Sequence, residues 1–374
     1  MTIYVDVSAA VNSRAGLGRY ARSLAQALID ELDTPPTLFY NRTDQAQDIP
    51  EWARVPRRSI RIGYKPWRMM IWQGQLFRIA FNRLVPGARL FHATEHLLMP
   101  LRDVPTVMTV HDLIYKLFPQ HHKKLNYWFL NLAMPLFVRR ADAIIVVSQA
   151  TKNDLIRHYG TPDNKITVVH EAAAPHFHVV SDSEVARVRA KYELPDRFLL
   201  AVGTIEPRKN LTRLAESLAR LRQDDRDLQL IVVGAKGWLY DDFFARLESL
   251  GVQNAVRLLG YVPDDDLPAI FRAATVYVMA SLYEGAGLPV LEAMACGAPV
   301  VSSRESSMPE LGADVARYFN PYDVDHMTDV IGMVLGDEKL RAQMAAAGPE
   351  RAAHFSWQRA ARETLAVYRS VMQS

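Results

Sequence analysis

The chain alternates short apolar runs rich in β-branched residues with longer amphipathic stretches, a pattern typical of βαβ units around parallel sheets. In the first half the apolar runs predict strands at 3–7, 37–40, 90–93, 106–110, 143–147 and 166–169. In the second half they predict strands at 198–202, 229–233, 256–259, 275–279 and 299–302. We therefore expect two α/β halves of similar size.

A segment with many small and polar residues, 171–196, separates the two series of strands. We place one domain at 1–178 and a second at 179–355, because 374 residues suit two cores better than one. In the remaining stretch, 356–374, Trp357, Ala361, Leu365 and Tyr368 form one apolar stripe at helical spacing. The sequence therefore predicts a final helix.

Composition narrows the class of protein. Apolar residues make up 49% of the chain and charged residues 23%, as in a soluble globular protein. The single cysteine, Cys296, excludes an internal disulfide and favours a reducing compartment; a core position explains it better than a nucleophile. We find no secretory signal and no apolar run long enough to cross a bilayer, so we expect a cytoplasmic protein.

The most informative segment follows the strand predicted at 275–279. Glu284 and Glu292 stand eight positions apart, and a glycine-containing turn separates them. The turn and helix start consist of Gly285, Ala286, Gly287, Leu288 and Pro289. Glycine lets backbone N–H groups approach a ligand, proline suits the first position of a helix, and the helix N-terminus attracts anions. Glu292 is expected on the first helical turn. This arrangement suits a nucleotide-sugar; the alternative is a strand–loop–helix unit with solvated carboxylates.

A second segment carries cations at the end of the strand predicted at 198–202. Gly203 ends that strand, and Arg208 and Lys209 precede a helix expected from 210 to 221. Ligands of open α/β sheets bind at the carboxyl ends of the strands, and both cations suit a diphosphate. The alternative is a basic loop at a helix start, where cations are unfavourable for the helix dipole.

Three residues of the first half are weaker candidates. His111 ends the strand at 106–110 and could hydrogen-bond a sugar hydroxyl or a phosphate, although a strand-end histidine is often structural. Gly16 and Gly18 follow the first strand. The third glycine of a dinucleotide fingerprint is missing, and Asn41 and Arg42 stand where its acidic residue would be, which disfavours nicotinamide binding.

The Glu284–Glu292 segment, the Gly203–Asn210 segment and the His111-Asp112 pair resemble motifs of the retaining GT-B glycosyltransferases of the GT4 type, nearest to bacterial mannosyltransferases. The resemblance covers nearly the whole chain. It implies two Rossmann-like domains facing across a cleft, with the helix at 356–374 packing back on the first domain. Thr204 departs from the pattern, because many relatives have arginine there.

The resemblance also implies a role for each site residue. Glu284 and His111 would contact the transferred sugar, and Glu292 the nucleotide ribose. Arg208 and Lys209 would bind the diphosphate. Gly16 and Gly18 would form a loop near the phosphates or the acceptor, and Gly203 and residues 285–289 would complete the donor site.

The implied activity is front-face transfer of a hexose with retention, from a nucleoside-diphosphate sugar to a glycan or a polyprenyl-diphosphate-linked acceptor. GDP-mannose is the favoured donor, with UDP-glucose-type donors open. The rival interpretations are a GT-B epimerase or phosphorylase and a nucleotide-sugar-binding protein without catalysis.

We expect neither a metal nor a cofactor. Residues 264–266 and 323–325 each contain an Asp-x-Asp pattern, but both precede probable helices, and N-capping explains them. No His/Cys cluster has zinc-site spacing, and Arg208 and Lys209 can do the work of a magnesium ion.

The region 52–94 contains no Asp or Glu. Its cations are Arg54, Arg57, Arg58, Arg61, Lys65, Arg68, Arg78, Arg83 and Arg89, and its aromatics include Trp52, Trp67, Trp72, Phe77 and Phe81. This mixture favours peripheral contact with an anionic membrane, at the inner face of the cell membrane. A second apolar stretch, flanked by Lys123, Lys124, Arg139 and Arg140, could extend the patch. The alternatives are a basic surface over buried aromatics and a nucleic-acid surface; no nucleic-acid motif accompanies the region, so we expect no nucleic-acid partner.

Overall fold

The structure is a computed structural model, and it describes residues 2–12, 15–44, 46–121 and 124–373. The chain forms two compact units, Met1–Glu171 with Ser356–Ser374, and Ala172–Phe355. The chain first passes from one unit to the other between Glu171 and Ala172, seven residues before the boundary predicted at 178/179. Phe177 explains the difference, because its buried ring packs on Phe271 of the second unit, with 6.1 Å between the ring centroids.

The first unit contains a seven-stranded parallel sheet in the order β3-β2-β1-β4-β5-β6-β7. The strands are β1 Ile3–Asp6, β2 Thr37–Asn41, β3 Arg57–Ile60, β4 Leu90–Ala93, β5 Thr106–Val110, β6 Ala143–Val146 and β7 Ile166–Val168. Six of them lie where the apolar runs predict them. β3 is the exception, because this exposed edge strand reads Arg-Arg-Ser-Ile and gives no apolar signal.

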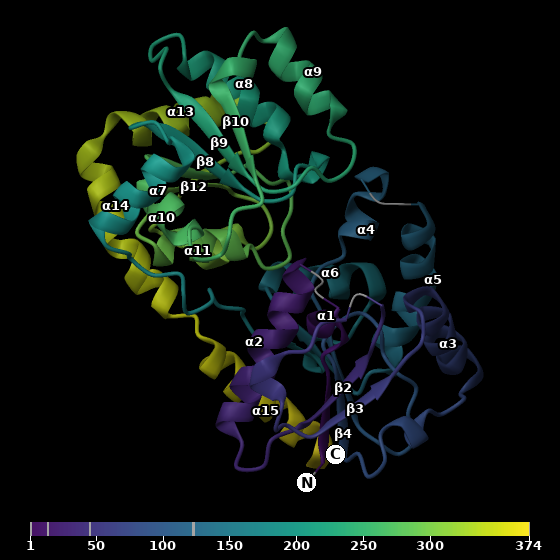
Figure 1. Cartoon of the computed structure of the whole chain (residues 1–374). Helices are drawn as coiled ribbons and strands as arrows, with labels where there is room; N and C mark the ends of the chain where they lie inside the picture. The colour runs from purple at the N-terminus through teal and green to yellow at the C-terminus, as the bar shows by residue number, and fades with distance from the viewer. Residues whose placement is uncertain (1, 13–14, 45, 122–123, 374) are drawn as a thin grey trace. The chain divides into compact units, whose positions relative to one another are not determined.

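The principal helices of the first unit are α1 Ser8–Val11, α2 Ala15–Glu31, α3 Tyr64–Phe77, α4 Ile114–Leu117, α5 Lys124–Arg140, α6 Gln149–Tyr159 and α15 Trp357–Gln373. The last helix, α15, packs along α2 (Figure 1). Tyr20 of α2 meets Trp357 of α15 edge to face, at 5.9 Å between ring centroids. The final segment of the chain is thus part of the first unit.

No helix among the described residues is long and apolar enough to span a membrane.

The second unit contains a six-stranded parallel sheet in the order β10-β9-β8-β11-β12-β13. The strands are β8 Phe198–Val202, β9 Gln229–Val233, β10 Val256–Gly260, β11 Val276–Met279, β12 Val300–Ser303 and β13 Arg317–Phe319. β13 was not predicted, because it is a three-residue edge strand without a β-branched residue. The order reverses between β8 and β11, and such a switch point is where open α/β sheets bind ligands.

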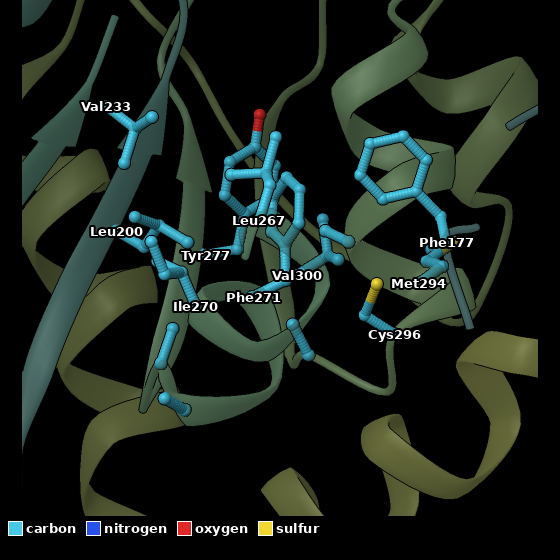
Figure 2. Packing of buried hydrophobic residues seen from close by; sticks show 14 of the residues in the cluster. Phe177, Leu200, Val233, Leu267, Ile270, Phe271, Tyr277, Met294, Cys296 and Val300 are labelled. Carbon is cyan, nitrogen blue, oxygen red and sulfur yellow. The ribbon is translucent and has the colours of Figure 1, made fainter. Parts of the chain in front are cut away.

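Helices cover both faces of the second sheet (Figure 1). One face holds α8 Leu211–Leu221, α9 Asp241–Ser249 and α13 Val324–Gly336. The other holds α7 Asp182–Tyr192, α10 Leu267–Ala273, α11 Leu288–Ala295 and α12 Met308–Gly312. Helix α14 Glu338–Ala353 contributes to both cores, with Met344 in the first and Ala352 in the second. Figure 2 shows the core on the second face, where Leu200 of β8 and Tyr277 of β11 meet Ile270 and Phe271 of α10. Cys296 is buried in this core, as expected, and burial raises the pKa of its thiol.

Candidate active site

The switch point of the second sheet brings the two informative sequence segments together. β8 and β11 run side by side, with Leu199 opposite Val276 and Leu200 opposite Tyr277. The loops that follow both strands therefore emerge at the same edge. They are bonded to each other: Leu282 N donates to the Arg208 carbonyl at 2.9 Å, and Asn210 Nδ2 donates to the Ala280 carbonyl at 3.1 Å.

Arg208, Lys209 and Glu284 form one ion cluster at this edge. Arg208 Nη1 and Lys209 Nζ each lie 2.7 Å from Oε1 of Glu284. Ser281 Oγ donates to the same carboxylate oxygen at 2.6 Å. All three charged side chains are largely buried, at 12–13% exposure. The cluster carries a net charge of +1 before its other neighbours are counted.

The Glu284 carboxylate is ionised at neutral pH. Burial alone would favour its neutral form, but the charges of Arg208 and Lys209 outweigh burial. Hydrogen bonds from Lys209 and Ser281 add to their effect, and the pKa of Glu284 falls to about 2. Glu284 is therefore an anion that accepts hydrogen bonds and is unsuited to donating a proton.

Glu206 holds Arg208 from the other side and was missed in the sequence. Its carboxylate is buried and pairs with Arg208 Nη2. Arg208 Nη1 also donates to the carbonyl of Tyr283 at 2.7 Å. The guanidinium thus has acceptors on both sides, which fixes its plane. The only sequence signal was that Glu206 lies in the same short segment as the two cations.

Gly203 makes room for the lysine. Its backbone has φ +143°, and a Cβ at this position would lie 3.0 Å from Cε of Lys209. Gly234, directly after β9, fits even more tightly, because a Cβ there would lie 2.1 Å from the Gly203 carbonyl oxygen. A side chain at Gly203 would therefore displace the Lys209 ammonium.

The loop at 285–289 leads into α11. Gly287 has φ +72° and precedes the helix, which begins at Leu288 and has Pro289 at its second position. Two serines fix the loop: Glu284 N donates to Ser306 Oγ at 2.8 Å, and Ser307 Oγ donates to the Glu284 carbonyl at 3.0 Å. Neither serine was singled out in the sequence, because serine is common in loops.

Glu292 is buried on α11, at 2% exposure. It is the fifth residue of the helix and opens the second turn, one position later than expected, because α11 begins at Leu288 and not at Pro289. Burial, followed by the charges of Glu292 and Glu284, raises the pKa of the Tyr277 hydroxyl well above its usual value. Glu284 and Glu292 are therefore both close enough to Tyr277, on β11, to affect its hydroxyl group.

His111 lies in the first unit, directly after β5, and both of its ring nitrogens have acceptors. Nδ1 lies 3.3 Å from the Glu171 carboxylate and Nε2 lies 2.9 Å from the Thr94 carbonyl. Burial disfavours a charged imidazole, but Glu171 and Thr94 outweigh it, with the charge of Asp112, and the pKa of His111 is raised. Acceptors on both sides favour the doubly protonated form of the ring. Glu171 was not recognised in the sequence.

A second histidine of the first unit, His92, lies on β4. It is fully buried between Tyr368, at 2.7 Å from Nδ1, and Thr109, at 2.8 Å from Nε2. Burial lowers its pKa to about 3, so this ring is neutral and ties α15 to β5.

The prediction that Gly16 and Gly18 form a loop before the first long helix is wrong. Gly16 and Gly18 lie in the first turns of α2 and not in a loop before it. Gly18 has a packing role, because a Cβ there would lie 2.9 Å from the Ala9 carbonyl oxygen of α1. Gly16 is exposed, and a Cβ there would meet no atom within 4 Å.

The Asp-x-Asp patterns have two different explanations. Asp323 caps α13, as expected, by accepting from His326 N. Asp266 makes no cap; its buried carboxylate accepts from Arg187, Lys191 and Tyr192 of α7, at 2.9, 2.6 and 2.7 Å. Within the described residues, no group of three or more His, Cys, Asp and Glu side chains is placed to hold a metal ion.

The basic and aromatic region 52–94 is only partly a surface. Trp52 and Trp67 are buried, and Trp72 and Phe81 are half-buried, whereas Phe77 is exposed. Eight of its nine cations are exposed; the half-buried one is Arg68, whose guanidinium lies 3.9 Å from the centre of the Phe129 ring. The two tryptophans belong to the core and not to a contact surface.

Two family descriptions match the chain. Residues 14–173 match Glycosyltransferase Family 4, and residues 184–351 match Glycosyl transferases group 1. The chain is 34% identical over 274 residues to the O-antigen chain mannosyltransferase B of Escherichia coli, with 72% of each chain covered.

Two further comparisons extend this similarity. The serotype-specific mannosyltransferase WbdA of Escherichia coli is 30% identical over 288 residues, which cover 74% of this chain and 35% of WbdA, so the chain spans about a third of that relative. The structure of a sucrose-phosphate synthase from Thermosynechococcus elongatus superimposes with a TM-score of 0.78 at 20% identity, covering 100% of both chains. This structural likeness concerns the fold.

Proposed function

The chain belongs to the family 4, group 1 glycosyltransferases and has their GT-B fold, and from this we propose that it transfers a mannosyl group from a nucleoside-diphosphate sugar to a glycan acceptor, with retention and without a metal ion. One observation carries the proposal. Two cations and a carboxylate meet at the carboxyl ends of β8 and β11, the switch point of the second sheet.

In the proposed reaction, the bond from the sugar C1 to the phosphate oxygen breaks, and a bond from C1 to the acceptor oxygen forms on the same face. The acceptor's proton goes to the departing diphosphate. Negative charge grows on the diphosphate as its bond breaks, and Arg208 and Lys209 stabilise that charge. Because the cluster is preformed and largely buried, this stabilisation needs little rearrangement.

The other site residues have proposed roles that follow from their chemistry. The ionised carboxylate of Glu284 accepts hydrogen bonds from sugar hydroxyls, and Glu292 does the same for the ribose. Backbone N–H groups at 285–288 approach the phosphates, Pro289 lies at the start of the helix, and Gly203 leaves room for Lys209. His111 stays a proposed contact of the sugar; its Nε2–H would then exchange the Thr94 carbonyl, which lies at 2.9 Å, for a sugar hydroxyl.

Mannose is the proposed sugar because the E. coli relatives are named mannosyltransferases. GDP-mannose is the first donor to examine, and UDP-glucose-type donors come next. The proposed acceptor is a glycan on a lipid carrier, which would place the protein at the membrane surface. Metal independence is supported by the two cations at the switch point, because Arg208 and Lys209 can bind the leaving diphosphate directly.

The proposal is tested with purified protein and radiolabelled GDP-mannose, UDP-glucose and dTDP-glucose, in the presence of EDTA. A membrane extract with its lipid-linked glycans serves as acceptor. We expect the label to enter the lipid fraction only from GDP-mannose, at a rate that EDTA leaves unchanged. Transfer from a UDP-sugar alone would overturn the choice of donor, and loss of transfer with EDTA would overturn metal independence.

The same assay separates the rival activities. A GT-B epimerase would produce an isomerised sugar without acceptor, and a phosphorylase would require inorganic phosphate. A non-catalytic binding protein would show tight donor binding without turnover.

A further inference from the structure

A band of exposed apolar side chains runs along α3 and α5 of the first unit. On α5, Leu125, Trp128 and Leu132 are each more than 60% exposed. On α3, Met69 and Phe77 are exposed at 43% and 67%. Large apolar side chains are normally scattered singly on a protein surface, and a contiguous group indicates an interaction site.

The two helices enclose a groove between them. Figure 1 shows α3 and α5 side by side in the first unit. The groove has a volume of about 380 Å³ and is lined by Met69 and Trp72 of α3 and by Leu125, Trp128 and Leu132 of α5. We call these five residues, with Lys65 and Lys124, the α3–α5 surface.

The charges of this surface are all of one sign. Lys65 and Lys124 are exposed, and neither α3 nor α5 contains an Asp or Glu. Arg68 lies along the groove and is held by Asn126, with 2.8 Å between Nη2 and Oδ1. The positive charge beside the apolar band is therefore not neutralised by carboxylates of its own helices.

We propose that the α3–α5 surface docks on an anionic lipid bilayer. Leu125, Trp128 and Leu132 follow helical spacing and form one stripe, which enters below the headgroups. Lys65 and Lys124 flank the stripe and bind lipid phosphates. An apolar stripe flanked by cations, on helices without carboxylates, fits an anionic lipid surface, where phosphates lie directly above an apolar interior. A nucleic acid offers phosphates without such an apolar layer.

This inference rests on the proposed function, since a lipid-linked acceptor is found at a membrane. It narrows the expectation drawn from the sequence. The docking residues include α5, outside 52–94, and leave out Trp52 and Trp67, which belong to the core.

Vesicle flotation of the full chain tests the proposal. The vesicles contain phosphatidylcholine alone or with about a third phosphatidylglycerol. We expect flotation with the anionic vesicles at low salt, and a loss of at least tenfold when Leu125, Trp128 and Leu132 are replaced together by Ser. Replacing Lys65 and Lys124 by Glu should have a similar effect. Raising the salt concentration should weaken binding, because exposed charges are screened.

Matched controls lie in the second unit, where Leu239 and Tyr261 are exposed at 57% and 79% and Lys339 is exposed. Leu239→Ser with Tyr261→Ser, and Lys339→Glu, should float like the wild type. A second readout is quenching of tryptophan fluorescence by brominated lipid, which Trp128→Phe should reduce. Circular dichroism and GDP-induced thermal shifts identify variants that fold and still bind nucleotide.

Four results would overturn the inference. The wild type does not float at low salt; the triple Ser variant floats normally; or the wild type is a dimer that the triple Ser variant converts to a monomer, which would assign the surface to a second copy. Tight binding to DNA or RNA that Lys65→Glu with Lys124→Glu abolishes, without flotation, would assign it to nucleic acid. A variant that loses flotation but keeps its GDP-induced thermal shift has lost membrane docking and not nucleotide binding. This result separates failure of docking from failure of the proposed function.

Discussion

The ammonium of Lys209 lies 2.7 Å from the Glu284 carboxylate, although the two residues are 75 positions apart in the chain. The pairing of β8 with β11 brings them together. A diphosphate that binds Lys209 competes with this carboxylate for the same ammonium. The ion pair therefore couples the sugar-binding candidate to the phosphate-binding candidate.

Lys209→Ala should lower the transfer rate by at least tenfold. The lysine stabilises charge that grows on the leaving diphosphate, and one such contact contributes about 3–4 kcal/mol to a transition state. The measurement is kcat with GDP-mannose. Lys339→Ala, at an exposed position of α14, is the matched control and should keep the wild-type rate. A near-normal rate for Lys209→Ala would remove this residue from the mechanism.

Glu284→Gln should separate the binding of the donor from the binding of its product. The amide no longer neutralises Arg208 and Lys209, so affinity for GDP should be equal or higher. Affinity for GDP-mannose and the transfer rate should both fall, because a carboxylate acceptor for sugar hydroxyls is lost. Isothermal titration calorimetry with both ligands measures the two affinities. Weaker GDP binding with unchanged transfer is the opposite pattern and would reject the sugar role.

Acid should destabilise the protein partly through Glu284. The pKa of this carboxyl is about 2 in the folded chain and near 4.5 without the fold, so its stabilising effect is full above 4.5 and disappears as the pH falls toward 2. The shift corresponds to about 3 kcal/mol. Urea unfolding of the wild type and of Glu284→Gln should differ at pH 7 and converge near pH 2. A difference that does not change with pH would contradict this assignment.

His111 should titrate above the usual pKa of a histidine. Its protonated form is stabilised in the folded chain, so its contribution to stability is present below the unfolded pKa and is lost as the pH rises through the folded pKa. Glu171→Gln removes the carboxylate and should lower the pKa of His111. NMR titration of the imidazole Cε1 protons measures the change. His92, with a pKa of about 3, should not titrate between pH 5 and 8. An unshifted His111 titration in Glu171→Gln would refute the ion pair.

Gly203→Ala should reduce both stability and activity. Its φ of +143° is a conformation that alanine rarely adopts, and the added Cβ would press on Lys209. We expect a loss of about 1–3 kcal/mol in the free energy of unfolding and a lower rate of transfer. Gly336→Ala is the control, because Gly336 has no positive φ and a Cβ there meets no atom within 4 Å. Equal stability of both variants would show that Gly203 is not constrained.

Much of this fold follows from the sequence, because strands buried on both faces leave continuous apolar runs. Edge strands do not leave such continuous apolar runs, and for that reason the sequence does not predict β3 or β13. Helix starts were less certain, as Gly16, Gly18 and Pro289 show. A glycine or proline near a predicted helix end fits equally well just inside or just outside the helix.

The site could be predicted only where charge and spacing are unusual. Arg208 and Lys209 at a helix start and the carboxylates Glu284 and Glu292 beside glycines stand out in the chain. Glu206 and Glu171 do not stand out in this way. A single carboxylate can be recognised as the partner of a cation only when the position of that cation in the fold is known. Likewise, Asp266 reads as a helix cap until its three partners on α7 are seen.

The most direct test of the account is a crystal structure of the chain with GDP bound. We predict diphosphate oxygens within hydrogen-bond distance of Lys209 Nζ and of the Arg208 guanidinium, with the ribose hydroxyls at Glu292. A diphosphate bound elsewhere in the molecule, with the Lys209–Glu284 pair undisturbed, would contradict it.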